Sequence, residues 1–244
     1  MSYPLQIINL GKTYKNLKAV KDISFSLNKD EILGILGPNG CGKTTTIGMI
    51  LGLLKPTNGK ILIFGEEIEK KRVKILNRLN FISPYVELPK KLTVKQNLKV
   101  YGKLYGVKEL NLKIEYLSEK LRLGEILNKI TGELSSGQKN RVSLAKSIIN
   151  DPEILLLDEP TASLDPETGD YIRSFLEEYQ KEMRASIILA SHNMSEVERL
   201  CSTVLMMNKG KIIDNGSPKE LVSKHGRKNM EEVFLKLNRE NNEY

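Results

Sequence analysis

The sequence contains no long apolar run, and its first residues do not predict a signal peptide. An uncharged stretch such as Thr44–Leu54 has 11 residues, well short of the ~18 that predict a helix crossing a membrane. The first residues, MSYPLQIINLGKTYK, lack the apolar core of a signal peptide. No internal repeat or low-complexity tract is found either. We therefore expect a soluble globular chain, so that any role at a membrane depends on a partner.

Cysteine is also rare, with two residues in the chain, Cys41 and Cys201. Cys41 lies within a glycine-rich stretch, where a disulfide would obstruct whatever that stretch holds. Both cysteines are therefore predicted to be free thiols, as is typical of a reducing cytoplasm.

The chain is positively charged but lacks the aromatic residues that usually accompany nucleic-acid binding. The formal net charge is +8, yet the lysines are scattered, with small clusters at 70–72 and 90–91. No aromatic side chains alternate with these clusters, as a platform for stacked bases requires. We interpret the charge as a contribution to solubility and expect no nucleic-acid partner.

Apolar segments and turn residues, by contrast, alternate regularly. At 244 residues, 40% of them hydrophobic, the chain is long enough for one well-filled core. The half-exposed segments LQIINL, ISFSL and KILIFG predict antiparallel strands, while the fully apolar ILGIL predicts a buried parallel strand. A helix is predicted from near Lys43 through TTTIGMILGLL, with its stop at Pro56.

From about Pro84 to Asn150 the apolar residues recur at spacings of three and four. This pattern predicts helices at LTVKQNLKVYGKLYG and NLKIEYLSEKLRL. Beyond this segment we expect the strand EILLLD, a helix from Pro166, the strand ASIILAS, a strand pair at TVLMMNKGKIID and two terminal helices. Alternating strands and helices on both sides of a helical insertion predict an α/β core with a nested helical subdomain.

The segment GPNGCGKT fits the phosphate-binding pattern G-x-x-x-x-G-K-[ST]. Glycines let backbone N–H groups converge on an anion, and the following helix points its positive N-terminus at the same place. Lys43 can reach the terminal phosphates, and the Thr44 hydroxyl can bind Mg²⁺. This loop alone does not distinguish a kinase, a GTPase or a motor. The residues predicted to bind the nucleotide here are Gly37, Pro38, Asn39, Gly40, Cys41, Gly42, Lys43, Thr44 and Thr45.

Two carboxylates follow the apolar strand in ILLLDEP. In open α/β sheets, ligands bind at the carboxyl ends of the strands, where Asp158 and Glu159 are expected. Asp158 is predicted to hold Mg²⁺ through water. Glu159 is predicted to polarise the water that attacks the γ-phosphate.

A third motif, LSSGQKNRVSLAKSII, predicts a helix that begins near Gly137 and is capped by Ser135 and Ser136. It resembles the signature LSGGQ of the ATP-binding-cassette (ABC) ATPases, with Ser136 in place of the first glycine. The motif lies 20 residues before Asp158, which is the arrangement of that family. Together with the phosphate loop and LLLDEP, it identifies a resemblance that covers nearly the whole chain.

The resemblance implies ATP and Mg²⁺ as ligands and a head-to-tail pair of ATPase domains. In such a pair each ATP lies between the phosphate loop of one subunit and the signature of the other. The implied partner is a second copy of this chain or a similar ATPase subunit. The signature residues that would act on the opposite subunit are Ser135, Ser136, Gly137 and Gln138.

Further positions match the family residue by residue. Tyr14 falls where the family places an aromatic ring that stacks on adenine. Ser163 and Asp165 correspond to the D-loop, which contacts the opposite subunit. His192 follows an apolar strand, as the switch histidine that senses the γ-phosphate does. His225 has no such context and is assigned no role.

One family feature is missing from its expected place. The family carries a glutamine just after the strand that leads into the helical subdomain, but here LNFISPYVELPKKLTV contains none before Gln96. Ser83 or Asn80 is the candidate substitute, and Ser83 is a candidate Mg²⁺ ligand. The segment from Asn80 to Leu92, with Pro84 and Tyr85 beginning a docking surface, is expected to carry the nucleotide state to a partner.

We therefore expect a P-loop NTPase core, a parallel sheet with helices on both faces, plus a small antiparallel β subdomain and a nested helical subdomain at about 84–150. The predicted ABC-type domain spans 4–235 and is followed by a polar tail, 236–244. The resemblance favours a peripheral ATPase subunit on the cytoplasmic face of the membrane, driving a separate permease and serving export. The alternative is a non-transport ABC ATPase in a soluble assembly, such as iron–sulphur cluster assembly.

Overall fold

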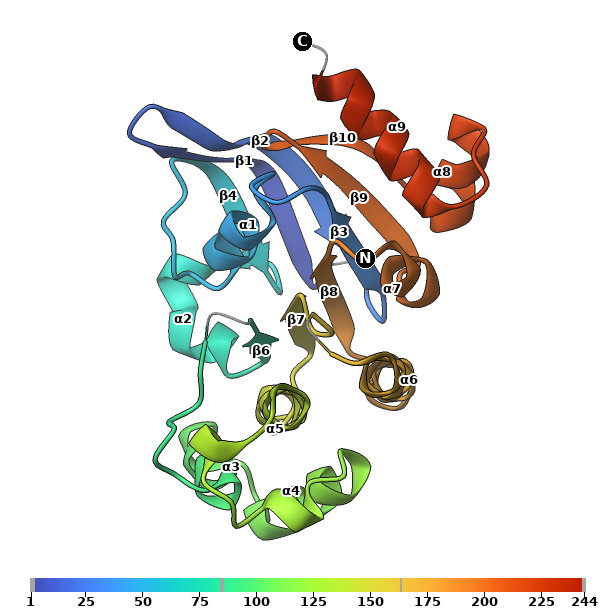
Figure 1. Ribbon diagram of the computed structural model, residues 1–244. Helices are drawn as coiled ribbons and strands as arrows, with labels where there is room; N and C mark the ends of the chain where they lie inside the picture. Colours follow the sequence, from blue (N-terminus) through green and yellow to red (C-terminus); the bar gives the residue numbers. More distant parts are fainter. Residues whose placement is uncertain (1–2, 84–85, 163, 243–244) are drawn as a thin grey trace. The chain divides into compact units, whose positions relative to one another are not determined.

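The computed structural model describes residues 3–83, 86–162 and 164–242. The chain divides into two compact units (Figure 1). The first unit combines residues 1–76 with 186–244, and the second is the continuous segment 77–185. Ser163, Pro84 and Tyr85, which carry predictions made above, lie outside the described residues.

An antiparallel sheet forms one part of the first unit, with strand order β2-β1-β4-β5. Its register pairs Leu5 with Leu27 and Leu5 with Ile63, so that all three side chains are buried on the same face. The predicted antiparallel strands are confirmed, and they extend further than their apolar cores, with several shifts of register along the β1–β2 ribbon. The strands are β1 (Leu5–Tyr14), β2 (Leu17–Leu27), β4 (Asn58–Ile63) and β5 (Glu66–Glu67).

The other sheet strands of the first unit surround β3 (Ile32–Leu36). β3 pairs in parallel with both β8 and β9, and all five of its residues are buried, as the apolar segment ILGIL predicts. β9 continues into an antiparallel pairing with β10, which confirms the predicted strand pair. These strands are β8 (Ser186–Ser191), β9 (Thr203–Asn208) and β10 (Lys211–Gly216).

The first helix is shorter than the sequence predicts. The sequence predicts a helix that continues towards Pro56, but the observed helix ends at Ile50. Gly52 takes a left-handed backbone (φ 65°), and the N–H groups of Leu53 and Leu54 both donate to the carbonyl of Gly48. This glycine-based stop ends the helix before proline is reached. The helices of the first unit are α1 (Lys43–Ile50), α2 (Ile68–Leu76), α7 (Met194–Leu200), α8 (Pro218–His225) and α9 (Met230–Asn242).

The two predicted terminal helices are α8 and α9. α9 continues through the first part of the segment predicted as a polar tail, and Leu237 within it is 7% exposed. The domain bounds 4–235 and 236–244 stay predictions.

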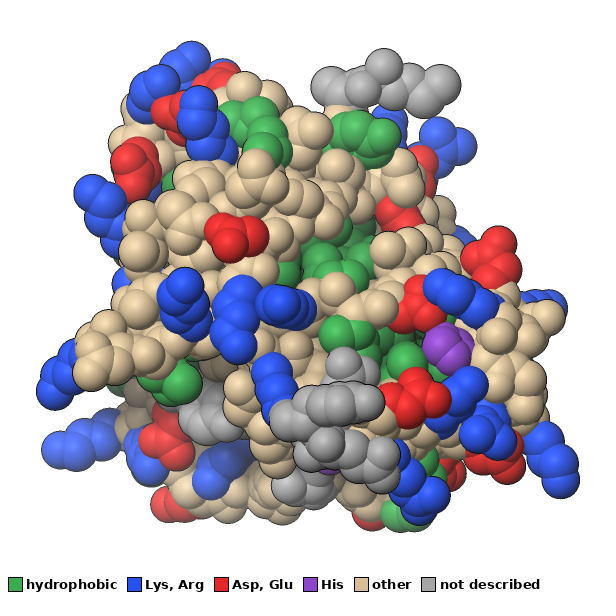
Figure 2. All heavy atoms as spheres, turned by 90° about the horizontal axis from the view of Figure 1, so that it is seen from above, with side chains coloured by type: hydrophobic (Ala, Val, Ile, Leu, Met, Phe, Trp, Pro, Cys, Tyr) green, Lys and Arg blue, Asp and Glu red, His purple; other side chains and the backbone are tan. Residues whose placement is uncertain are grey.

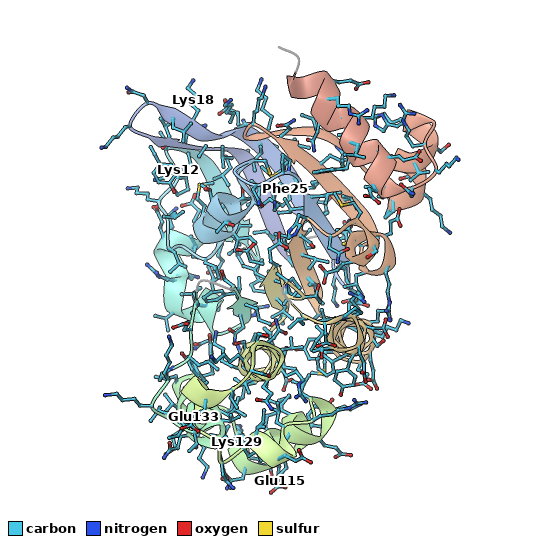
Figure 3. The ribbon with its side chains drawn as sticks, in the orientation of Figure 1. Lys12, Lys18, Phe25, Glu115, Lys129 and Glu133 are labelled. Carbon is cyan, nitrogen blue, oxygen red and sulfur yellow. The ribbon has the colours of Figure 1, made fainter. Side chains whose placement is uncertain are left out.

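The second unit places a helical segment between two parallel strands, β6 (Leu79–Ile82) and β7 (Ile154–Asp158). This confirms the predicted helical insertion, and the unit as a whole also includes both strands and α6. Glu115, labelled in Figure 3, comes from α4 of this insertion. The helices are α3 (Val94–Leu104), α4 (Leu110–Lys120), α5 (Ser136–Ser147) and α6 (Pro166–Met183), with short 3₁₀ turns at Gly124–Ile126 and Thr131–Glu133.

Charged side chains are spread over the surface. On the face shown in Figure 2, Lys and Arg side chains lie in separate groups with Asp and Glu side chains between them. Within the part of the chain that the structure describes, no helix has both the length and the apolarity needed to cross a membrane.

Candidate functional site

The glycine-rich loop connects β3 to α1 in the first unit. Gly42, directly before α1, takes a left-handed backbone with φ of 112°. A Cβ atom at Gly42 would lie 2.8 Å from the carbonyl oxygen of Ala19, and one at Gly37 would lie 2.3 Å from that of Met207. The close approach explains why glycine is required at Gly37, and the close approach together with the positive φ explains it at Gly42.

The first turn of α1 carries the predicted phosphate-binding side chains. Lys43 is 7% exposed, and its Nζ donates to the carbonyl oxygens of Gly37 (2.6 Å) and Pro38 (3.4 Å). Its ammonium group therefore lies across the concave side of the loop. Thr44 is exposed beside it, while Thr46 turns inward and donates to the carbonyl of Gly42 at 2.9 Å. The backbone N–H groups of this turn and the Lys43 ammonium group together can bind an anion.

Cys41 has a structural position in this loop. Its carbonyl accepts a hydrogen bond from the N–H of Gly210 at 3.0 Å, and its side chain is 2% exposed. Burial raises the pKa of the Cys41 thiol, which disfavours the reactive thiolate. Cys41 and Cys201 are both free, as predicted.

Two further predicted site residues lie in the first unit. Tyr14, the last residue of β1, is 41% exposed, and Lys12 Nζ lies 5.0 Å from the centroid of its ring; Figure 3 labels Lys12. His192 is exposed and follows β8, between two fixed neighbours. Ser191 donates to Glu196 at 2.7 Å, and Asn193 caps α7. Tyr14 and His192 are thus both exposed at the ends of strands, while their roles stay predictions.

The carboxyl end of β7 carries Asp158 and Glu159 in the second unit. Asp158 is 1% exposed, and Ser83 Oγ donates to its Oδ2 at 3.4 Å. Glu159 is half-buried and has a left-handed backbone with φ of 53°, which is unusual for a residue with a side chain. The strand ends at Asp158, directly before the turn at Glu159.

The two candidates for the missing glutamine have different surroundings. Asn80 is fully buried, and its amide donates to Asn150 Oδ1 at 2.8 Å while its oxygen accepts from Lys146 Nζ at 3.2 Å. These hydrogen bonds hold the Asn80 side chain in the interior of the second unit. Ser83 instead contacts Asp158. The geometry therefore favours Ser83 as the residue beside the predicted metal ligand.

Lys146, which the sequence patterns did not single out, is buried near this strand. Its Nζ also approaches the carbonyl of Phe81 (3.4 Å) and lies 4.7 Å and 5.3 Å from the ring centroids of Phe81 and Tyr101. Burial lowers the pKa of Lys146 to about 8. This lysine connects α5 to β6 and α3 through polar and cation–π contacts.

The signature-like motif forms the N-terminus of α5. Ser135 is the N-cap, so the helix begins at Ser136, one residue before the predicted start. Ser135 Oγ accepts from the N–H of Gln138 at 3.3 Å, and the Gln138 side chain accepts from the N–H of Ser135 at 3.0 Å. A hydroxyl that accepts one bond retains its own proton to donate, so Ser135 is equipped to bind an anion as well as to cap the helix. Gly137 lies in the first turn.

Of the two predicted D-loop residues, the structure describes Asp165. It caps α6, and its Oδ1 accepts from the N–H of Thr168 at 2.9 Å. The hydrogen bond from Thr168 lowers the pKa of the Asp165 carboxyl.

Comparison with known proteins identifies the family. A family model described as "ABC transporter" matches residues 20–162, and a second, described as "AAA domain, putative AbiEii toxin, Type IV TA system", matches residues 131–198. The chain belongs to the ABC transporter family. It is an ATP-binding subunit of that family and an ATP hydrolase.

Individual relatives match over most of their length. "ABC transporter ATP-binding protein NatA" of Bacillus subtilis is 34% identical over 91% of this chain and 91% of its own. "Nod factor export ATP-binding protein I" of Rhizobium johnstonii is 36% identical over 89% of this chain and 70% of its own. The structure of CbiO1 from Clostridium perfringens, described as part of the ABC transporter complex CbiONQ, covers 92% of both chains with a TM-score of 0.80 and 31% identity. These names give no support to the alternative of a soluble assembly.

Proposed function

We propose that this chain pairs through ATP with a second ATP-binding subunit and drives a separate membrane permease in the direction of export. The supporting observation is the capped N-terminus of α5, where Ser135 and the first-turn N–H groups form an anion-binding element in the second unit. The phosphate loop is another such element in the first unit. In a two-fold pair each ATP uses the phosphate loop of one subunit and the signature of the other.

The residue roles in this proposal follow the chemistry of the side chains. Lys43 binds the terminal phosphates, and Glu159 polarises the attacking water. Tyr14 stacks on the adenine, His192 senses the γ-phosphate, and Ser163 with Asp165 contacts the opposite subunit. ATP favours the closed pair because its oxygens contact both subunits, and hydrolysis removes that link.

Mg²⁺ suits the oxygen donors that the chain offers. Thr44 supplies a hydroxyl, and Asp158 supplies a carboxylate with the Ser83 hydroxyl beside it. Mg²⁺ prefers a site of one or two carboxylates completed by substrate phosphates and water, and this set matches that preference. When bound, the ion would neutralise charge on the phosphates.

The permease and the direction of transport are inferred from the relatives. CbiO1 is described as one part of a transporter complex, and the Rhizobium relative is named for export. By analogy we place this chain on the cytoplasmic face of a membrane, bound to a permease encoded as a separate protein.

Light scattering of the Glu159→Gln variant tests the pairing. We expect a monomer without nucleotide and a dimer with Mg–ATP, because the variant retains ATP without hydrolysing it. A variant that stays monomeric at high protein and nucleotide concentrations would contradict the shared site. Stimulation of the parent ATPase by a six-helix membrane protein from a neighbouring gene, reconstituted in lipid, tests the partner.

A further inference from the structure

A side-chain hydrogen bond joins α5 to the loop that follows β7. Asn140, in the second turn of α5, donates from Nδ2 to the carbonyl oxygen of Pro160 at 2.6 Å. Pro160 directly follows Glu159, and both lie in the second unit with α5. The bond therefore reaches the residue next to the proposed hydrolytic carboxylate.

The orientation of the Asn140 amide follows from its surroundings. Turning the amide over would place Oδ1 against the carbonyl oxygen of Pro160, and two acceptors repel. Oδ1 is buried and accepts no hydrogen bond from the described residues or their backbone. A buried acceptor without a partner costs stability. A gain in stability alone therefore does not explain why asparagine occupies this position. The specific hydrogen bond from its Nδ2 to Pro160 does.

The loop that accepts this hydrogen bond has an unfavourable backbone conformation at Glu159. Glu159 holds φ at 53°, and the turn continues with hydrogen bonds from Ala162 N to Glu159 O (3.2 Å) and from Leu164 N to Thr161 O (3.3 Å). Proline has no N–H, so the carbonyl is the only backbone group with which Pro160 can be anchored. Asn140 supplies that anchor from a neighbouring helix.

Open space beside the loop makes an anchor important. A cavity of about 280 Å³ is lined by Asn140, Ser143 and Glu159, among others. Because one side of Glu159 faces this cavity, close packing does not hold it there. A strained turn beside open space has room to relax when its anchor is removed.

We infer that Asn140 is a positioning residue that holds Glu159 in place for ATP hydrolysis. The inference rests on the role proposed for Glu159. Ser135 caps α5, and Gln138 and Asn140 lie within it, so one rigid helix carries the signature at its N-terminus and the anchor of the hydrolytic loop one turn later. If the nucleotide held by the opposite subunit displaced α5, the hydrogen bond from Asn140 to Pro160 would transmit that movement to Glu159 of the same chain.

The test uses four variants of the 244-residue chain. Asn140→Ala removes the amide, and Asn140→Asp keeps its shape while replacing the donor with an acceptor. Asn140→Gln restores a donor with one more methylene, for which the cavity has room. Ser143→Ala is the matched control, because Ser143 lies three residues further along α5 and lines the same cavity. Steady-state kcat and KM, ATP affinity and unfolding midpoints are measured for each.

We expect kcat to fall roughly 10- to 100-fold in Asn140→Ala and Asn140→Asp, the range for a misplaced catalytic group. KM and ATP affinity should stay within about twofold, since ATP binding does not use this bond. Asn140→Gln should recover most of the lost kcat, and Ser143→Ala should match the parent. Parent-like kcat in Asn140→Ala and Asn140→Asp would overturn the inference. So would an Asn140→Gln variant as slow as Asn140→Ala.

Glu159→Gln, measured alongside, separates this inference from the proposed function. If Glu159→Gln hydrolyses ATP like the parent, the role proposed for Glu159 is wrong. If Glu159→Gln is inactive while the Asn140 variants turn over normally, only the positioning role fails.

Discussion

The phosphate loop of the first unit and the loop after β7 in the second unit are held by different kinds of contact. Neighbouring strands and turns hold the phosphate loop through backbone atoms, since Gly210 N donates to Cys41 O at 3.0 Å and the backbone of Met207 leaves no space for a side chain at Gly37, while the loop's own Lys43 donates to the carbonyl of Gly37. Polar side chains fix the second loop, through Asn140 to Pro160 and Ser83 to Asp158. The first loop should therefore be sensitive to atoms added at Gly37 and Gly42, and the second loop to the identity of a few side chains.

Glu159→Gln has the largest expected effect in the second loop. The amide keeps the size of the side chain but is no longer a base, so turnover should fall by roughly 10²–10⁴-fold. ATP binding should remain intact, as measured by nucleotide titration beside steady-state phosphate release. Lys43→Ala is the contrasting variant, because it should weaken ATP binding itself. Parent-like hydrolysis by Glu159→Gln would contradict the catalytic role of Glu159 in the loop after β7.

Gly42→Ala tests the backbone-held loop. The new Cβ would meet the carbonyl of Ala19 at 2.8 Å on a backbone with φ of 112°. Strain of about 1–3 kcal/mol corresponds to ATP binding weakened by roughly 5- to 150-fold. Gly65→Ala is the control, because Gly65 has a positive φ but no atom within 4 Å of the added Cβ. Equal ATP affinity in the two variants would show that crowding at Gly42 does not matter.

Lys146→Met tests the side-chain contacts of the second unit through their pH dependence. The pKa of Lys146 is about 8 in the folded chain and ~10.4 when unfolded, so between these values the unfolded chain binds more protons. Stability should therefore rise with pH across this window, by about 2–3 kcal/mol. The difference between parent and Lys146→Met in chemical denaturation, followed from pH 7 to 10, isolates this contribution. A constant difference would contradict the lowered pKa.

Ser83→Ala has the smallest expected effect. Its bond to Asp158 is long at 3.4 Å, so we expect basal ATPase activity to change by less than about threefold. Asn80→Ala should instead lower the unfolding midpoint, because it removes buried bonds to Lys146 and Asn150. If Asn80→Ala lowered kcat at unchanged stability and Ser83→Ala did nothing, Asn80 would be the better candidate near the metal.

Much of the fold was predictable because its signals are local. The apolar run ILGIL, the glycines before Lys43 and the cap at Ser135 each determine an element through neighbouring residues. The prediction that α1 ends near Pro56 is wrong. Proline is the stronger helix-stop signal in a sequence, but Gly52 comes earlier along the chain and ends the helix first. The motifs likewise placed Asp158 at the end of its strand.

The contacts that organise the second loop could not be predicted in the same way. Asn140 and Pro160 are 20 residues apart, and no periodicity encodes their hydrogen bond. Lys146 is an ordinary residue in a helical pattern, and its burial depends on Phe81 and Tyr101 from other elements. The choice between Ser83 and Asn80 depended on which way each side chain turns. Such pairings arise from tertiary packing.

The two units also differ in whether they consist of one segment of the sequence or two, and this difference affects folding during translation. The second unit is one continuous segment, so all its contacts become available once residue 185 has left the ribosome. The first unit pairs Ile32 with Ile187 and Leu33 with Thr203, so its central strand waits for residues made much later. Long-range pairing of this kind slows folding. During translation the apolar β3 therefore stays without its neighbours until the second unit is complete, and this interval is when the nascent chain is most prone to aggregate.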